Sequence, residues 1–191
     1  MRLGKTRLPL PTEEYERQWG DQLIRAIDQN LEALDSNISS SASITGYYGS
    51  FYSTVNQTAA AINTPYAMTF NNTDSSNQIA VVSNSRITFK NRGIYNVQFS
   101  AQIRQTAGTP HNIWIWLRNN GVDVPNSTGQ SVIQGTKSEL ILAWNYIVNV
   151  LSGDYVEFMW AVEDTSVKLA YDAATAFAPA TPSVIATAVS V

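Results

Sequence analysis

The sequence contains no cysteine and a single histidine, His111. The lack of cysteine excludes a disulfide framework and a thiolate metal site, and one histidine is too few for a multi-histidine metal site. Charged residues make up only 14% of the chain, with 12 basic and 15 acidic side chains and a formal net charge of −3. This weakly acidic balance argues against nucleic acid as the main partner.

Long hydrophobic runs are lacking as well. The residues after Met1 read RLGKTRLPLP, which contains no apolar core of a secretion signal, and no later run approaches the length of a membrane-spanning helix. We therefore expect a soluble protein that is made in the cytoplasm without a secretion signal and that does not insert into a membrane.

The few charges are unevenly distributed. Residues 1–35 contain five of the 12 basic residues and seven of the 15 acidic residues, whereas Asn, Gln, Ser and Thr supply most of the polarity of the remaining chain. The chain therefore has two unlike parts. We divide it into an extended arm at 1–11, a helix at 12–35, a linker rich in Ser and Gly at 36–46 and a β domain at 47–191.

The arm contains the segment Leu-Pro-Leu-Pro, which favours an extended backbone because proline restrains its own φ and the conformation of its predecessor. One interpretation is a disordered terminus. The other is a docking arm that becomes ordered on contact with a partner. In that case its basic and apolar side chains carry the contact, namely Arg2, Lys5, Arg7, Leu8 and Leu10.

The helix is predicted from Thr12, an N-cap residue followed by glutamates that suit the positive end of the helix dipole. Apolar residues then recur at spacings of three and four. Isoleucine at both core positions of a heptad favours three-stranded coiled coils. We expect a trimerisation helix with the core positions Ile24, Ile27, Leu31, Leu34 and Ile38. The alternative is a helix that packs on its own domain.

The remaining chain is rich in segments that alternate apolar and polar residues, as strands do and helices do not. Gly, Asn and Pro turn signals separate these segments. The predicted strands are 85–91, 93–104, 111–121, 138–151, 154–163, 166–172 and 182–191, with shorter pieces at 46–54 and 67–70. Some ten strands in a domain of this size predict an all-β fold, an antiparallel two-sheet jelly-roll sandwich.

Several strands have two apolar faces. In 111–118, Ile113, Ile115 and Leu117 lie on one face, and Trp114 and Trp116 on the other. A sandwich strand needs only one apolar face, so a second copy of the chain is the natural cover for the other. We expect a homotrimer interface at Trp114, Trp116, Trp144 and Tyr146. The alternative is a stacking platform for carbohydrate.

Residues that could perform chemistry are scattered. Glu163 and Asp164 are expected in a turn that faces solvent, and His111 is expected at the surface without a nucleophile to activate. No loop has the spacing of acidic ligands that calcium requires. We therefore expect no catalytic residues, no metal and no cofactor, and the chain is predicted not to be an enzyme.

Four segments, in order, carry a resemblance to a known family. Gly93, Tyr95, Val97 and Phe99 resemble the Gly-x-Tyr-x-Phe-x-aromatic signature of the globular head of complement component 1 subcomponent q, whose jelly roll is shared with tumour necrosis factor; Val97 replaces the usual Phe. LRNNG at 117–121, LSGDYV at 151–156 and PSVIATAVSV at 182–191 are similar to later family segments. The resemblance implies a trimeric jelly roll whose first and last strands are neighbours. It also implies a core filled by Tyr95, Val97 and Phe99, with Gly93 at a turn where a Cβ would crowd or φ is positive.

The sequences of the loops, and of the arm and the helix that follows it, are similar to those of structural proteins of tailed bacteriophages. This resemblance implies a trimeric virion protein, a fibre head or a capsid or tail decoration. Residues 1–35 would bind another virion protein (capsid, portal or tail), and the jelly roll would face outward for host attachment. The alternative is a carbohydrate-binding adhesion module that uses its Trp faces and Asn-rich loops to bind a host surface glycan.

Overall fold

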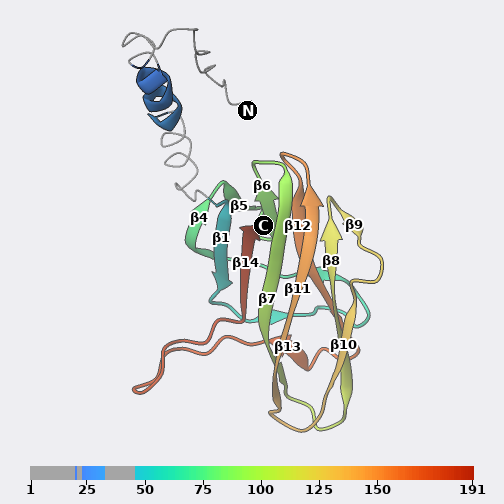
Figure 1. Cartoon of the computed structure of the whole chain (residues 1–191). Helices are drawn as coiled ribbons and strands as arrows, with labels where there is room; N and C mark the ends of the chain where they lie inside the picture. Colours follow the sequence, from blue (N-terminus) through green and yellow to red (C-terminus); the bar gives the residue numbers. More distant parts are fainter. Residues whose placement is uncertain (1–19, 21–22, 33–45) are drawn as a thin grey trace. The chain divides into compact units, whose positions relative to one another are not determined.

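The computed structural model describes Gly20, residues 23–32 and residues 46–191. The chain divides into two compact units, Met1–Thr45 and Gly46–Val191 (Figure 1). Residues 23–32 are helical, within the predicted range 12–35. The described part of the chain contains no helix with the length and hydropathy of a membrane span.

Three of the predicted heptad positions belong to this helix. Ile24, Ile27 and Leu31 are 58%, 41% and 57% exposed, and their spacing of three and four places them on one face. Leu34, Ile38 and the five arm residues Arg2, Lys5, Arg7, Leu8 and Leu10 lie outside the described residues.

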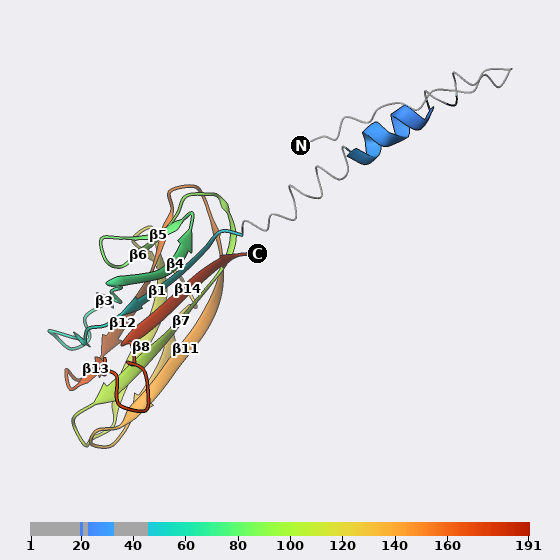
Figure 2. The same cartoon turned by 90° about the vertical axis from the view of Figure 1, so that its left-hand side faces the viewer.

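The second unit is a sandwich of two antiparallel seven-stranded sheets (Figures 1 and 2). Sheet A consists of β1 (Tyr48–Ser53), β2 (Gln57–Thr58), β4 (Asn72–Asn77), β7 (Gly93–Gln105), β11 (Glu139–Val150), β13 (Val167–Leu169) and β14 (Val184–Ser190). Sheet B consists of β3 (Tyr66–Ala67), β5 (Ile79–Val82), β6 (Arg86–Phe89), β8 (His111–Asn119), β9 (Val122–Asp123), β10 (Gly129–Ile133) and β12 (Tyr155–Val162).

The predicted fold class, an all-β antiparallel two-sheet sandwich, is confirmed, with fourteen strands in place of about ten. The first and last strands are neighbours, since β1 pairs with β14 from Tyr48 opposite Val189 to Ser53 opposite Val184. The prediction missed β4, whose sequence NTDSSN has no apolar residue to alternate. It also missed β2, β5, β9 and β10, which have two to five residues and are too short to show a period.

Strand β7 contributes the centre of the core. Tyr95, Val97 and Phe99 point between the sheets and are 0%, 0% and 3% exposed, as the family resemblance implied. One edge of β7 pairs with β11 over twelve residues, and the other edge pairs with β14 and β13. The Phe99 ring meets Phe158 of sheet B at a centroid distance of 4.9 Å, which joins the two layers.

Gly93, at the start of β7, has a φ outside the positive range, so the left-handed alternative for this residue is wrong. A Cβ at this position would lie 3.3 Å from Cε2 of Tyr95. The expected crowding is therefore confirmed, and the glycine lets the Tyr95 ring pack against the backbone at the strand start.

The four aromatic residues of the expected trimer interface do not share one surface. Trp144 and Tyr146 of β11 point between the sheets, where Trp144 lies 5.6 Å from Phe99 and Tyr146 lies 6.4 Å from Phe158 by ring centroids. Trp114 and Trp116 of β8 point outward from sheet B, opposite the core residues of the same strand. The register of β11 with β7 decides this separation, because it places Trp144 opposite Phe99 on the inner face.

The close approach of Trp144 to β10 gives a stability prediction. A Cβ at Gly129 would lie 2.6 Å from Cη2 of Trp144, a half-buried ring that packs against the core. We expect Gly129→Ala to lower the free energy of unfolding by about 1–3 kcal/mol, because the ring must shift to admit the methyl group. Urea unfolding measures the change. Gly108→Ala is the control, since its Cβ meets only the Thr136 hydroxyl, at 3.1 Å. An equal loss in both variants would contradict the packing argument.

Candidate functional site

A groove of 520 Å³ lies on the outer face of sheet B. Its base is β8, where Trp114 and Trp116 alternate with the buried Ile113, Ile115 and Leu117 and therefore point outward, each of them half-buried. Ala161 of β12 lies beside Trp114 across the strand pair. The lining residues are Asn63, Pro65, Trp114, Trp116, Asp123, Val124, Pro125, Asn126, Thr128 and Ala161.

The loop from Val124 to Thr128 forms one wall and is fixed to β8 through Ser127. Leu117 N donates to Ser127 Oγ at 3.0 Å, and Ser127 Oγ donates to the Val124 carbonyl at 2.7 Å. Tyr146 Oη, which comes from sheet A, donates to the Ser127 carbonyl at 2.8 Å. Burial raises the pKa of Tyr146, so this hydroxyl keeps its donor proton at neutral pH. The wall is thus held by both sheets.

The opposite wall contains Asn63 and Pro65, from the segment that precedes β3. Asn63 N donates to the Val162 carbonyl at 2.8 Å, which ties the segment to the end of β12. Asn63 and Asn126, one on each wall, have positive φ angles of 51° and 61°. Asparagine tolerates this left-handed backbone better than most residues, and this tolerance is a local structural reason for asparagine at both positions.

One carboxylate lines the groove, and it is neutralised locally. Asp123 Oδ1 accepts hydrogen bonds from Trp116 Nε1 at 2.8 Å and from Arg118 Nε at 2.7 Å. These bonds, the one from Arg118 first, hold the pKa of Asp123 below its usual value. By contrast, no hydrogen bond from the described residues engages the side chains of Asn63, Asn126 and Thr128. The groove therefore combines aromatic faces with polar groups that are free to bind a ligand.

The outer face of sheet A has a different chemistry. The outward positions carry no charge from Ile94 to Gln102 of β7 or from Ile141 to Asn149 of the neighbouring strand β11. Large hydrophobic side chains on this face are 41–62% exposed, namely Tyr48, Ile94, Ile141, Ile147, Ile185 and Val189. We call this set of outward residues on β1, β14, β7 and β11 the aliphatic face.

Charges reappear at one end of the aliphatic face. Arg104 Nη2 lies 2.7 Å from Glu139 Oε1 and 2.5 Å from Asp172 Oδ2. The hydrogen bond from Arg104 is the main cause that lowers the pKa of Asp172, and the two carboxylates in turn raise the pKa of Arg104. One guanidinium faces two carboxylates, so the network keeps a net negative charge and marks where the uncharged surface ends.

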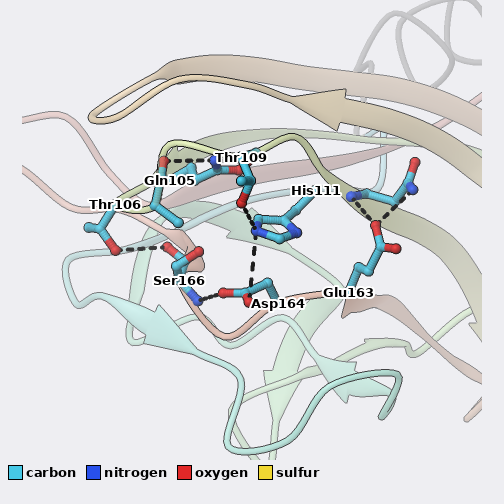
Figure 3. Close-up of polar contacts among 9 residues, drawn as sticks. Gln105, Thr106, Thr109, His111, Glu163, Asp164 and Ser166 are labelled. Carbon is cyan, nitrogen blue, oxygen red and sulfur yellow. Dashed lines mark hydrogen bonds and ion pairs between the residues drawn. The ribbon is translucent and has the colours of Figure 1, made fainter.

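A polar cluster surrounds His111 at the start of β8 (Figure 3). His111 Nε2 lies 2.9 Å from Thr109 Oγ1 and 3.8 Å from Asp164 Oδ2. The His111 side chain is 18% exposed, so the histidine lies at the surface but is partly covered.

The carboxylates of this cluster hold the turn in place. Glu163 and Asp164 lie in the turn between β12 and β13, as predicted. Glu163 Oε2 accepts from Asn112 N and Nδ2, both at 2.9 Å, and Asp164 Oδ1 accepts from Ser166 N at 2.8 Å. The bonds from Asn112 are the main causes that lower the pKa of Glu163, and the side chain of Ser166, followed by its backbone N–H, is the main cause that lowers the pKa of Asp164. Within the described ranges, no group of three or more His, Asp or Glu residues could hold a metal ion.

The sequence pointed to part of the groove. The alternation of 111–118 predicts outward positions for Trp114 and Trp116, and the segment 119–129, which contains Asp123, Asn126 and Thr128, is one of the Asn-rich loops of the glycan-binding alternative. Asn63 and Pro65 were missed. They precede Trp114 by about fifty residues, and only the pairing of β3 with β12 brings their segment to the groove.

The groove carboxylate gives a pH prediction. The folded-state pKa of Asp123 is depressed below its unfolded value of about 3.9, so the carboxylate stabilises the fold above that pH and loses this effect as the pH falls through the folded pKa. We expect Asp123→Asn to lower the urea midpoint at pH 6 and to have a smaller effect near pH 3.

The control is Asp74→Asn on β4, an exposed carboxylate without a hydrogen bond or ion pair to any described residue. Its effect on the midpoint should be small at both pH values. A deficit of Asp123→Asn that is the same at pH 6 and pH 3 would count against the ion pair as the source of the stabilisation.

Comparisons with known proteins show a similarity of fold to solved structures. No protein-family model matches the chain, and no curated protein matches it. A similar solved structure is the globular domain of the zebrafish complement 1qA protein, which is 16% identical in sequence with a TM-score of 0.46. The match covers 76% of this chain and 97% of that domain.

Proposed function

We propose that the chain is a non-enzymatic structural protein that displays its β-sandwich as a homotrimer. The observation that carries this proposal is the aliphatic face, where exposed isoleucines such as Ile141, Ile147 and Ile185 lie among uncharged Asn, Gln, Ser and Thr side chains. The centres of subunit interfaces are depleted of charged residues in this way, whereas the free surfaces of monomers rarely carry extended apolar patches.

A second copy of the chain is the occupant that this face fits best. Burial of apolar surface contributes about 25 cal/mol per Å², and a flat sheet face offers a large area without a charge to desolvate. Sheet A also has a rim of its own, since the network of Arg104, Glu139 and Asp172 closes one end. The heptad pattern with Ile24 and Ile27 at successive core positions supports three copies rather than two.

The virion role rests on the sequence resemblance to structural proteins of tailed bacteriophages. In this proposal residues 1–35 anchor the trimer to a capsid, portal or tail protein, and the sandwich is a fibre head or decoration that meets the host surface. Three copies of a weak site on one rigid head would bind a surface with far higher avidity than one copy.

The first test of assembly changes the aliphatic face. We expect Ile147→Glu combined with Ile185→Glu to convert a trimer into monomers, because each charge would be buried without a partner in the interface. Light scattering during size exclusion measures the mass. Both side chains are exposed in the single chain, at 62% and 41%, so the fold should be retained. Val132→Glu, at an exposed position of sheet B, is the matched control and should leave the mass unchanged.

The second test removes the helix. Because the aliphatic face lies wholly within residues 46–191, a chain that begins at Ser43 is expected to remain trimeric. A truncated monomer beside a full-length trimer would assign assembly to the helix. A full-length monomer would overturn the proposal.

The virion role makes a separate prediction. Deletion of residues 1–35 should leave the sandwich folded and trimeric but remove the protein from purified particles, because the anchor would be lost. Mass spectrometry of particles assembled with the full or the shortened chain measures incorporation. Undiminished incorporation of the shortened chain would rule out residues 1–35 as the anchor, and absence of the full chain from particles would refute the virion role itself.

A further inference from the structure

The groove on sheet B lies on the opposite layer of the sandwich from the aliphatic face, so assembly through sheet A does not use it. We propose that this groove binds a neutral saccharide. Its volume of 520 Å³ is within the range of about 300–1,000 Å³ that small-ligand sites occupy.

The aromatic side chains supply a surface for sugar rings. Trp114 and Trp116 are two residues apart on β8 and present their indoles on the same outward face, with Pro125 on one side and Pro65 on the other. A pyranose ring has a face of C–H groups that is apolar and flat, and an indole offers a flat apolar partner with little conformational entropy to lose. A single stacked ring would bury both surfaces.

The free polar groups match the hydroxyls around such a ring. Each carboxamide of Asn63 and Asn126 offers two donor hydrogens and an acceptor oxygen, and the Thr128 hydroxyl both donates and accepts. Sugar hydroxyls also donate and accept, so each can be satisfied from either wall. Asp123 adds its second oxygen, Oδ2, since the bonds from Trp116 and Arg118 both end on Oδ1.

The charge of the groove distinguishes among ligands. No Lys or Arg lines it, and Asp123 is paired with Arg118, so a phosphate, a nucleic acid or an acidic sugar finds no unpaired cation. A proline-rich peptide is the competing occupant, because such peptides dock in aromatic grooves. The chain itself contains Leu-Pro-Leu-Pro at 8–11. The Trp116 indole N–H already donates to Asp123, so only the Trp114 indole N–H could bind a peptide carbonyl, and the peptide is tested as a competing outcome below.

The walls are fixed before a ligand arrives. Ser127 holds the loop to Leu117 and receives the Tyr146 hydroxyl from the other sheet, and the Asn63 backbone is bonded to β12. A site that is already ordered loses less entropy on binding, which matters for a saccharide because each hydroxyl exchanges bonds with water for bonds with protein.

The test is a glycan array probed with the labelled full chain. The array should carry neutral oligosaccharides of hexose, N-acetylhexosamine and deoxyhexose beside sialylated, uronic acid and sulfated ones. We expect binding to a subset of the neutral glycans. Titration calorimetry with one neutral hit should then show that Trp114→Ala weakens binding about tenfold or more, since a stacked ring loses its partner. Thr128→Val should weaken it severalfold without a change of shape.

Tyr155→Ala is the matched control, because Tyr155 is an outward aromatic residue on the same sheet that stacks under Arg86 outside the groove. It should bind like the unchanged chain. Solution mass and circular dichroism, unaltered in all three variants, separate loss of binding from loss of fold or assembly.

Three results would overturn the proposal. One is that no neutral glycan binds at millimolar concentration. Another is that binding survives Trp114→Ala. The third is that only acidic glycans, or a synthetic peptide of residues 6–13, bind in a manner that depends on Trp114. Because the solution mass of each chain is measured separately, a failure of saccharide binding is distinguishable from a failure to form the trimer.

Discussion

The register of β7 in sheet A is the constraint on which both outer surfaces depend. This strand is hydrogen-bonded to β11 on one edge and to β14 and β13 on the other. A shift of one residue would turn Tyr95, Val97 and Phe99 to solvent and bring Asn96, Gln98 and Ser100 into the core. The loss of three large buried side chains far exceeds what alternative pairing could restore. The register is therefore determined by burial, and β11 follows it residue by residue.

The register of β7 affects the outer surfaces of both sheets. With Phe99 opposite Trp144 and Val97 opposite Tyr146, the rings of β11 lie between the sheets, and Ile141 and Ile147 necessarily lie outside. The inward Tyr146 then reaches the Ser127 carbonyl and holds the loop that forms one wall of the groove. One pairing thus exposes the aliphatic face of sheet A and also shapes the groove of sheet B.

The sequence predicted the parts of this fold that local patterning encodes. Alternation located the long strands β7, β8, β11 and β12, and the pair Asn120 and Gly121 closes the turn from β8 to β9 with the positive φ angles that this dipeptide favours. The alternation also distinguishes the two faces of β11, because Trp144 and Tyr146 share their face with Leu142 and Val148, whereas the other face contains Asn145 and Asn149. The expected place of the two rings in a subunit interface is therefore contrary to the strand's own pattern. The contribution of Asn63 and Pro65 to the groove depends instead on the long-range pairing of β3 with β12, which no local pattern encodes.

The outer surfaces of sheet A and sheet B differ in chemistry, and the difference suits two kinds of partner. On sheet B the chain itself buries much of the apolar surplus, since Met159 and Ala161 are 3% and 7% exposed, and leaves two indoles among free amides. On sheet A branched aliphatic side chains remain exposed among uncharged polar residues, which suits a protein surface better than a hydrated sugar. Trimers that bury sheet A would leave the groove of every copy on the outside of the assembly. A weak site that is repeated three times at fixed spacing binds a repetitive surface far more strongly than one site alone. In the proposed trimer, burial of one layer would therefore make modest affinity in the other layer sufficient.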